Sequence, residues 1–317
     1  MMNQPQLTRR GILKTMSLAA GAVWAGPRAT QAEENPAGGR VHLATNHYSW
    51  IVYFNRDKRD FNQLLDEGLG EVAASGINGF EANVNVPEDI GRFAPLLKKH
   101  GLEMRSFYVN CVLHTAEEAE KSIAQVLAIA DPAHAIGTKI IVTNPSPIQW
   151  GGAGDKTDEQ LRIQAQALEK LGKALQERGM ILAYHNHDME LRQAAREFHH
   201  MMAGTDPRYV TLCLDAHWIY RGSGNSQIAL FDIVKLYGKR VTELHLRQSV
   251  NQVWAETFGE GDIDYPALAQ ALLALDVKPH LVMEQAVETG TPHTLSPVEA
   301  HRRSVEYARR VFADFAG

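Results

Sequence analysis

Residues 181–190 read Ile-Leu-Ala-Tyr-His-Asn-His-Asp-Met-Glu, and the fold can be worked out from this stretch. A short apolar run ends in His185 and His187, which are two positions apart. Because strand side chains alternate between the two faces, both imidazoles belong to one face. The pattern predicts a buried strand over Ile181–His187 whose C-terminal end presents polar groups on one side only.

The same pattern recurs along the chain, with helical segments between the copies. The predicted strands are Val41–His47, Ile77–Asn83, Glu103–Asn110, Lys139–Asn144, Ile181–His187, Tyr209–His217, Val241–Arg247 and His280–Glu284. Eight strand–helix units over about 270 residues, without a Pro/Gly-rich linker, predict one (β/α)8 barrel. A doubly wound open sheet is the alternative, but no Gly-rich phosphate loop follows any predicted strand.

Residues that typically begin and end helices fall between these strands. Thr115-x-x-Glu118 and Thr157-x-x-Gln160 predict capping boxes, and Asp264 with Pro266 predicts another helix start. Ser296-Pro297-Val298-Glu299 predicts a capping box with a first-turn proline. Gly76, Gly101 and Gly179 stand where helices should end. The glycine-rich loop Ser146–Asp155, which contains Trp150, is the predicted flexible lid.

The first 32 residues differ from the rest of the 317. They contain Arg9, Arg10, Lys14 and Arg28, no acidic residue, and a weakly apolar stretch before Thr30-Gln31-Ala32. This layout predicts a twin-arginine signal peptide over residues 1–32, export to the periplasm, and a barrel domain over residues 33–317. An amphipathic N-terminal helix is the alternative.

Charge and composition limit the partners. Removing those four basic residues lowers the formal net charge from −5 to −9, which argues against nucleic acid and anionic membranes as partners. No apolar run reaches the roughly 20 residues that span a bilayer. Cys111 and Cys213 lie in or beside apolar strands, so we expect two buried thiols rather than a disulfide. The sequence leaves open whether the chain forms a homo-oligomer.

Polar residues of one parity gather at the ends of the last four predicted strands. They include His185 on the fifth, Asp215 on the sixth, His245 on the seventh and Glu284 on the eighth. So many polar groups cannot stay unpaired in a dry barrel, and convergence on a divalent cation would satisfy them. Mixed nitrogen and oxygen ligands suit Mn²⁺, Co²⁺, Fe²⁺, Zn²⁺ or Mg²⁺.

Four motifs resemble the sugar phosphate isomerase/epimerase superfamily of xylose isomerase-like TIM barrels. They are residues 184–190 (YHNHDME), 214–217 (LDAH), 243–245 (ELH) and 259–264 (GEGDID), in the family's order along the mature chain. Many relatives hold a metal with Glu, Asp, His and Glu from strands five to eight. The resemblance therefore implies Asp215, His245 and Glu284 as ligands.

One position departs from that pattern, because His185 stands where a glutamate is usual. Glu190 or His187 could take its place as the fifth-strand ligand. The resemblance further implies that His217 and Arg247 contact substrate oxygens. It implies that Glu81 supports the substrate or the ligands.

Such a metal would polarise a hydroxy-ketone and stabilise the enediolate formed by proton abstraction. Glu284, His187 and Glu190 are the candidate bases, and aromatic residues near strand ends, Trp218 among them, could stack on a sugar. Returning the proton gives epimerisation or isomerisation, which we expect first. The alternative is loss of a β-hydroxyl or glycosidic oxygen, which gives a keto-sugar or keto-glycoside lyase or hydratase similar to an inosose dehydratase.

Export favours a free sugar, a keto-sugar or a glycoside as substrate, because phosphorylated sugars are mainly cytoplasmic. A carbohydrate-binding barrel without catalysis is the competing class. An endonuclease-IV-like hydrolase would need more histidines and a basic face.

Overall fold

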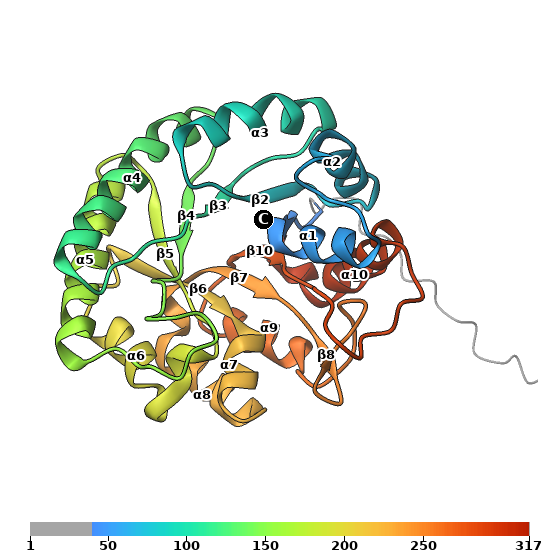
Figure 1. The fold of residues 1–317 in the computed structure, drawn as a ribbon. Coiled ribbons are helices and arrows are strands. Elements are labelled where there is room, and N and C mark those ends of the chain that lie inside the picture. The colour runs from blue at the N-terminus through green and yellow to red at the C-terminus, as the bar shows by residue number, and fades with distance from the viewer. Residues whose placement is uncertain (1–39, 317) are drawn as a thin grey trace, which may run out of the picture. The chain divides into compact units, whose positions relative to one another are not determined.

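The computed structural model describes residues 40–316, which form one closed barrel inside a ring of helices (Figure 1). Neighbouring strands are all parallel, and their order around the barrel is β1-β10-β7-β6-β5-β4-β3-β2. The strands are β1 (Leu43–Asn46), β2 (Gly79–Asn83), β3 (Ser106–Tyr108), β4 (Ile140–Thr143), β5 (Ile181–His185), β6 (Val210–Asp215), β7 (Val241–Leu246) and β10 (His280–Met283). All eight predicted strands are present, which confirms the (β/α)8 barrel.

Helices follow the strands and cover the barrel from outside. They are α1 (His47–Arg56), α2 (Leu65–Ala74), α3 (Pro87–His100), α4 (Ala116–Ala135), α5 (Asp158–Gln176), α6 (Arg192–Ala203), α7 (Ala216–Gly222), α8 (Gln227–Tyr237), α9 (Tyr265–Leu273) and α10 (Pro297–Val311). Three short 3₁₀ turns complete them: η1 (Met189–Leu191), η2 (Gly238–Arg240) and η3 (Ala313–Phe315). None of the described helices is long and apolar enough to cross a membrane.

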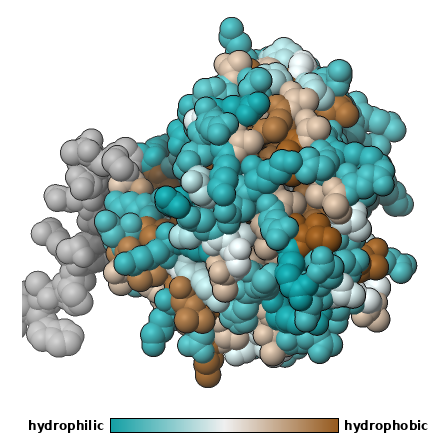
Figure 2. All heavy atoms as spheres, turned by 90° about the vertical axis from the view of Figure 1, so that its left-hand side faces the viewer, coloured by the Kyte–Doolittle hydropathy of each residue, from teal (hydrophilic) through white to brown (hydrophobic). Residues whose placement is uncertain are grey.

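The helices are amphipathic, so their apolar sides pack on the barrel and their polar sides face water. On α5, Leu161, Leu168 and Leu175 recur at seven-residue spacing and are buried. The face of the molecule on the α4 and α5 side is mostly hydrophilic, with apolar residues scattered over it (Figure 2). This arrangement leaves the strand ends as the place for chemistry.

All four predicted helix starts are confirmed, but two of the three predicted capping boxes do not form. Thr157 and Gln160 form the reciprocal capping box of α5, and the side chains of Asp264 and Ser296 cap α9 and α10. Thr115 precedes α4, but its side chain makes no capping hydrogen bond. Glu299 pairs with arginines on its own helix, so Ser296 caps α10 through its own side chain.

Other predictions have mixed outcomes. Gly76, Gly101 and Gly179 all have positive φ angles at helix ends, as expected. Cys111 and Cys213 are free and buried, which confirms the prediction of two thiols. The antiparallel hairpin of β8 (Ser249–Val250) and β9 (Val253–Trp254) was not predicted. The predicted signal peptide and the domain boundary after residue 32 lie outside the described residues.

Candidate metal and substrate site

The four side chains predicted to bind a metal meet at the C-terminal end of the barrel. His185 and Asp215 are the last residues of β5 and β6, His245 is the fifth residue of β7, and Glu284 directly follows β10. One ligand atom from each residue lies within 4.8 Å of the other three, and all four residues are buried. The alternation of side chains along each strand therefore predicted correctly which faces of the four strands point to a common centre.

Asn186 explains why the end of β5 can turn two imidazoles toward the same side. Its side-chain amide donates to the carbonyl of Asp215 at 3.1 Å and accepts from the Asp215 amide at 3.1 Å. The amide thus continues the ladder between β5 and β6 after backbone pairing ends. His185 and His187, on the other parity, remain close, with ring centroids 4.8 Å apart.

The distances within the cluster suit a shared cation. Nδ1 of His245 lies 2.8 Å from Oε2 of Glu284 and 3.1 Å from Nε2 of His185. The same His185 nitrogen is 3.8 Å from both Oδ2 of Asp215 and Oε2 of Glu284. Among the described residues, Oδ2 of Asp215 has no hydrogen-bond partner although it is buried.

The protonation equilibria of the cluster also support a shared cation. Burial and the neighbouring Glu284 raise the pKa of Asp215 to about 8. Burial opposes a charge on His245, yet Cys213, Glu81 and Glu284 hold its pKa well above the ordinary value. The site therefore attracts positive charge, which a divalent ion would supply in place of a proton. The donor set, two imidazoles and two carboxylates, fits Mn²⁺, Fe²⁺, Co²⁺, Zn²⁺ or Mg²⁺.

Two buried carboxylates orient the His245 ring on the side away from the other three candidate ligands. Its other ring nitrogen, Nε2, lies 3.1 Å from a carboxylate oxygen of Glu243 and 3.1 Å from one of Glu81. A hydrogen on Nε2 leaves Nδ1 free to bind a cation, which is the arrangement usual for metal-ligating histidines. Glu81 therefore contacts a candidate ligand, and Asn46 donates to it at 3.0 Å. Our sequence-based site did not include Glu243, although it shares the parity of His245.

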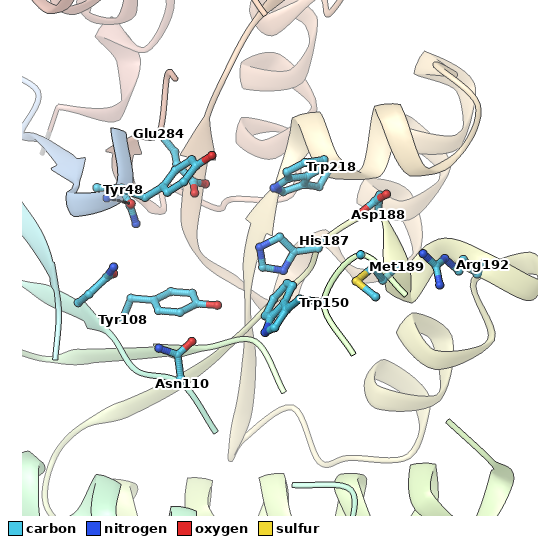
Figure 3. A pocket seen from close by; sticks show the side chains of 13 residues that line it. Tyr48, Tyr108, Asn110, Trp150, His187, Asp188, Met189, Arg192, Trp218 and Glu284 are labelled. Carbon is cyan, nitrogen blue, oxygen red and sulfur yellow. Dashed lines mark hydrogen bonds between the residues drawn. The ribbon is translucent and has the colours of Figure 1, made fainter. Parts of the chain in front are cut away.

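A cavity of about 420 Å³ opens next to the cluster, a volume within the range of small-molecule sites. Glu284, His187 and Trp218, three of the candidate catalytic and substrate-binding residues, line it. His187 lies between Trp218 and Trp150, and the Tyr108 hydroxyl points toward Trp150 (Figure 3). Burial and the nearby His185 keep the pKa of His187 well below its ordinary value, so the ring is uncharged and its surroundings oppose protonation.

Two residues expected to touch substrate oxygens lie behind the cavity wall. The Arg247 guanidinium is 4.3 Å from the Trp254 ring centroid and 5.1 Å from that of Trp218, and its Nε donates to the Glu284 carbonyl at 2.9 Å. Nε2 of His217 is 3.1 Å from Oγ of Ser249. Both residues are fully buried, so in this structure they support the wall and Glu284.

Glu190 is also turned away from the cavity. It lies in η1, where Oε1 accepts from the Asn144 side chain at 3.0 Å and Oε2 accepts from the His187 backbone amide at 2.7 Å. Asn144 additionally donates to the His185 carbonyl at 3.0 Å. The carboxylate thus fixes the backbone that carries the two histidines.

The opposite side of the cavity comes from the first three strands and was not predicted. Asn46 ends β1, Asn83 ends β2, and Tyr108 ends β3, with Asn110 two residues further on. Their amide and hydroxyl groups can donate to and accept from sugar hydroxyls. Tyr108 belongs to the aromatic residues near strand ends, which the sequence indicates only as a group. The asparagines gave no signal, because neutral amides are common in loops.

Comparison with known proteins yields both a family and individual relatives. The family described as xylose isomerase-like TIM barrel matches residues 69–311. An inosose dehydratase of Clostridium perfringens is 25% identical over 292 residues, which cover 82% of this chain and 94% of that protein.

Solved structures share the fold at lower identity. A sugar phosphate isomerase/epimerase of Parabacteroides distasonis aligns with a TM-score of 0.68 and 16% identity, covering 92% of this chain and all of that one. A 3-keto-D-glucoside 4-epimerase of E. coli aligns with a TM-score of 0.63 and 14% identity, covering 86% of this chain and all of that one. These two likenesses bear on the fold alone.

Proposed function

Because the chain belongs to the xylose isomerase-like TIM barrel family, we propose that it removes a proton from the carbon next to the carbonyl of a keto-sugar or keto-cyclitol. The observation that carries the proposal is the convergence of His185, Asp215, His245 and Glu284 beside a cavity lined with amides and a neutral imidazole. A divalent cation held by these four residues would polarise the substrate carbonyl.

The remaining steps belong to side chains that the structure describes. His187 lines the cavity, so its ring is placed to take up the proton. Negative charge that develops on the substrate would offset the cost of protonating this buried ring. Asn46, Asn83 and Asn110 line the other side of the cavity and would orient the substrate hydroxyls. Trp218 supplies an apolar surface for the face of the ring.

Two reactions can follow the same proton abstraction. Returning the proton to either carbon gives an epimerase or isomerase, and the fold of the 3-keto-glucoside epimerase is compatible with it. Loss of water gives a dehydratase, which the relatives named inosose dehydratases favour, since the match covers 94% of the protein from C. perfringens. We put both forward, with the first step in common.

One experiment separates these reactions. The protein, loaded in turn with each divalent metal, is incubated in D₂O with a panel of keto-sugars and inososes and followed by NMR. Deuterium beside the carbonyl without loss of water supports the epimerase or isomerase, and release of water supports the dehydratase. Binding without any exchange would show a carbohydrate-binding barrel and overturn the proposal. A His187→Gln variant should lose the exchange, whereas His293→Ala, at a half-exposed surface position, should keep it.

Export remains a separate proposal, which rests on residues 1–32 alone. Fused to a reporter that is active only after transport through the twin-arginine pathway, these residues should direct it to the periplasm. Replacing both Arg9 and Arg10 with lysine should abolish transport. Equal transport by both versions would refute a twin-arginine signal.

A further inference from the structure

Large apolar side chains are exposed around the mouth of the barrel. Trp150 is 53% exposed and Ile148 46%, both on the loop between β4 and α5. Val86 is 47% exposed where α3 begins after β2, and Tyr48 is 40% exposed where α1 begins after β1. All four residues lie at the C-terminal end of the strands, which is the end that carries the candidate site. Of the four, Tyr48 and Trp150 also line the cavity, and exposed apolar side chains beside a cavity are candidates for contact with a ligand.

Trp150 links this surface to the cavity. It is among the residues that line the cavity, and its ring stands edge-on to His187 with centroids 5.2 Å apart. Figure 3 shows the indole on the side of His187 that is opposite Trp218. One part of the indole therefore faces the candidate base, and much of the rest faces open solvent.

The loop that carries Trp150 is tied to its surroundings at several points. The Ser146 amide donates to the Cys111 carbonyl at 2.8 Å, and Nζ of Lys156 donates to the Pro145 carbonyl at 3.1 Å. Nη1 of Arg192 donates to the Gly152 carbonyl at 2.9 Å. These bonds fix both ends of the loop and its middle, so the indole is held as a platform at the mouth.

We propose that Trp150 forms an outer subsite for the aglycone of a keto-glycoside, next to the inner subsite where the keto-sugar reacts. This inference rests on the proposed function and narrows its substrate class. An apolar aglycone, such as an aryl group, can stack on the indole and remove it from water while the sugar ring occupies the polar interior. Arg192 also lines the cavity, but its Nη1 donates to the Gly152 carbonyl and lies 3.7 Å from Oδ1 of Asp155, whose charge partly offsets its own.

The test measures substrate preference rather than activity alone. kcat/KM is determined for a free 3-keto-hexose and for its methyl and phenyl glycosides, with the wild type, Trp150→Ala, Trp150→Phe and Leu236→Ala. Leu236 is 64% exposed on α8, away from the barrel mouth, and serves as the matched control. We expect the wild type to prefer the phenyl glycoside over the free sugar by about tenfold or more, as a filled apolar pocket allows.

The variants decide the outcome. Trp150→Ala should bring the ratio close to one, Trp150→Phe should restore most of it, and Leu236→Ala should leave it unchanged. A wild-type ratio near one, or a ratio that survives in Trp150→Ala, overturns the outer subsite. Sedimentation of the wild type and of Trp150→Ala provides a further check. A wild-type dimer that Trp150→Ala converts to monomers would assign the patch to a second copy of the chain and also overturn it.

Failure of the proposed reaction remains distinguishable. If no keto-sugar is turned over, binding of unreacted phenyl and methyl glucosides is measured by calorimetry. A preference for the phenyl compound that disappears in Trp150→Ala would retain the subsite while the reaction is abandoned. Equal binding of both compounds would overturn the subsite as well.

Discussion

Nε2 of His185 lies 3.1 Å from Nδ1 of His245, although the residues are 60 positions apart and β6 separates their strands. Two imidazole nitrogens that face each other in a dry interior must share either a proton or a cation. Carboxylates of Asp215 and Glu284 lie within 3.8 Å of the His185 nitrogen, so the surroundings favour added positive charge.

We therefore expect the protein to bind one divalent ion per chain, and His245→Ala to weaken this binding at least a hundredfold. The variant removes one ligand and leaves three in place, so residual binding should be measurable. Calorimetric titration with Mn²⁺ and Zn²⁺ checks the affinity, and the melting temperature should rise with metal in the wild type. His293→Ala is the matched control, and equal affinities in all three proteins would refute the site.

Glu243 should matter for metal affinity even though it lies one layer below the ligands. Glu243→Gln keeps the size of the side chain but weakens the acceptor for Nε2 of His245, so we expect a loss of about tenfold to a hundredfold. Glu81→Gln acts on the same nitrogen, and the double variant should differ from the sum of the single effects. Additive losses in the same titration would show that the two carboxylates act independently of each other and not through one shared nitrogen.

The layered interior of the barrel explains what the sequence could and could not predict. Alternation along a strand tells which face a side chain takes, and this was sufficient to find the strands and to group His185, Asp215, His245 and Glu284. The alternation of side chains does not tell how deep a residue lies inside the barrel. Glu243 shares the parity of His245 but lies deeper, where it supports the imidazole instead of facing the cavity.

Other parts of the site depend on contacts that no local pattern encodes. Glu190 was a candidate base, but it bonds to Asn144, which is 46 residues away, and to the His187 backbone. Asn46 and Asn83 line the cavity, yet a neutral amide after a strand fits any polar loop. The sequence therefore predicted the charged half of the site, where burial requires partners, better than the neutral half.

Arg247 should stabilise both the folded protein and the ionised form of Glu284. It is fully buried against the rings of Trp218 and Trp254, and its Nη2 lies 3.1 Å from Oε1 of Glu284. Arg247→Met would leave that carboxylate buried without its cation, so we expect about 3–5 kcal/mol of destabilisation in urea unfolding. Arg303→Met, which breaks an exposed pair with Glu299, should cost less than about 1 kcal/mol.

The same Arg247→Met change should alter a pH profile. Burial opposes ionisation of Glu284, but Arg247 and His245 keep its pKa well below the ordinary value. Without the guanidinium this pKa rises, so the acidic limb of metal binding should move to higher pH. An acidic limb at the wild-type position would show that Arg247 does not set the charge of Glu284.

The raised pKa of Glu190 should make the free energy of unfolding depend on pH. Burial and the nearby Glu197 raise its pKa to about 7 from an ordinary 4.5, so the folded protein holds a proton that the unfolded chain has released. The stabilisation associated with that proton is complete below pH 4.5 and is lost as the pH rises through about 7. Above that, ionised Glu190 costs the fold up to about 3 kcal/mol.

Glu190→Gln removes this titration and keeps the size of the side chain. Its amide can accept from only one of the two donors, Asn144 and the His187 backbone, which lowers stability by a constant amount at every pH. The difference in unfolding free energy between variant and wild type should therefore shift in favour of the variant between pH 5 and pH 8. Urea unfolding at several pH values measures it, with Glu177→Gln, an exposed position at the end of α5, as control. A difference that stays constant with pH would show that Glu190 is already ionised in the folded protein at pH 5.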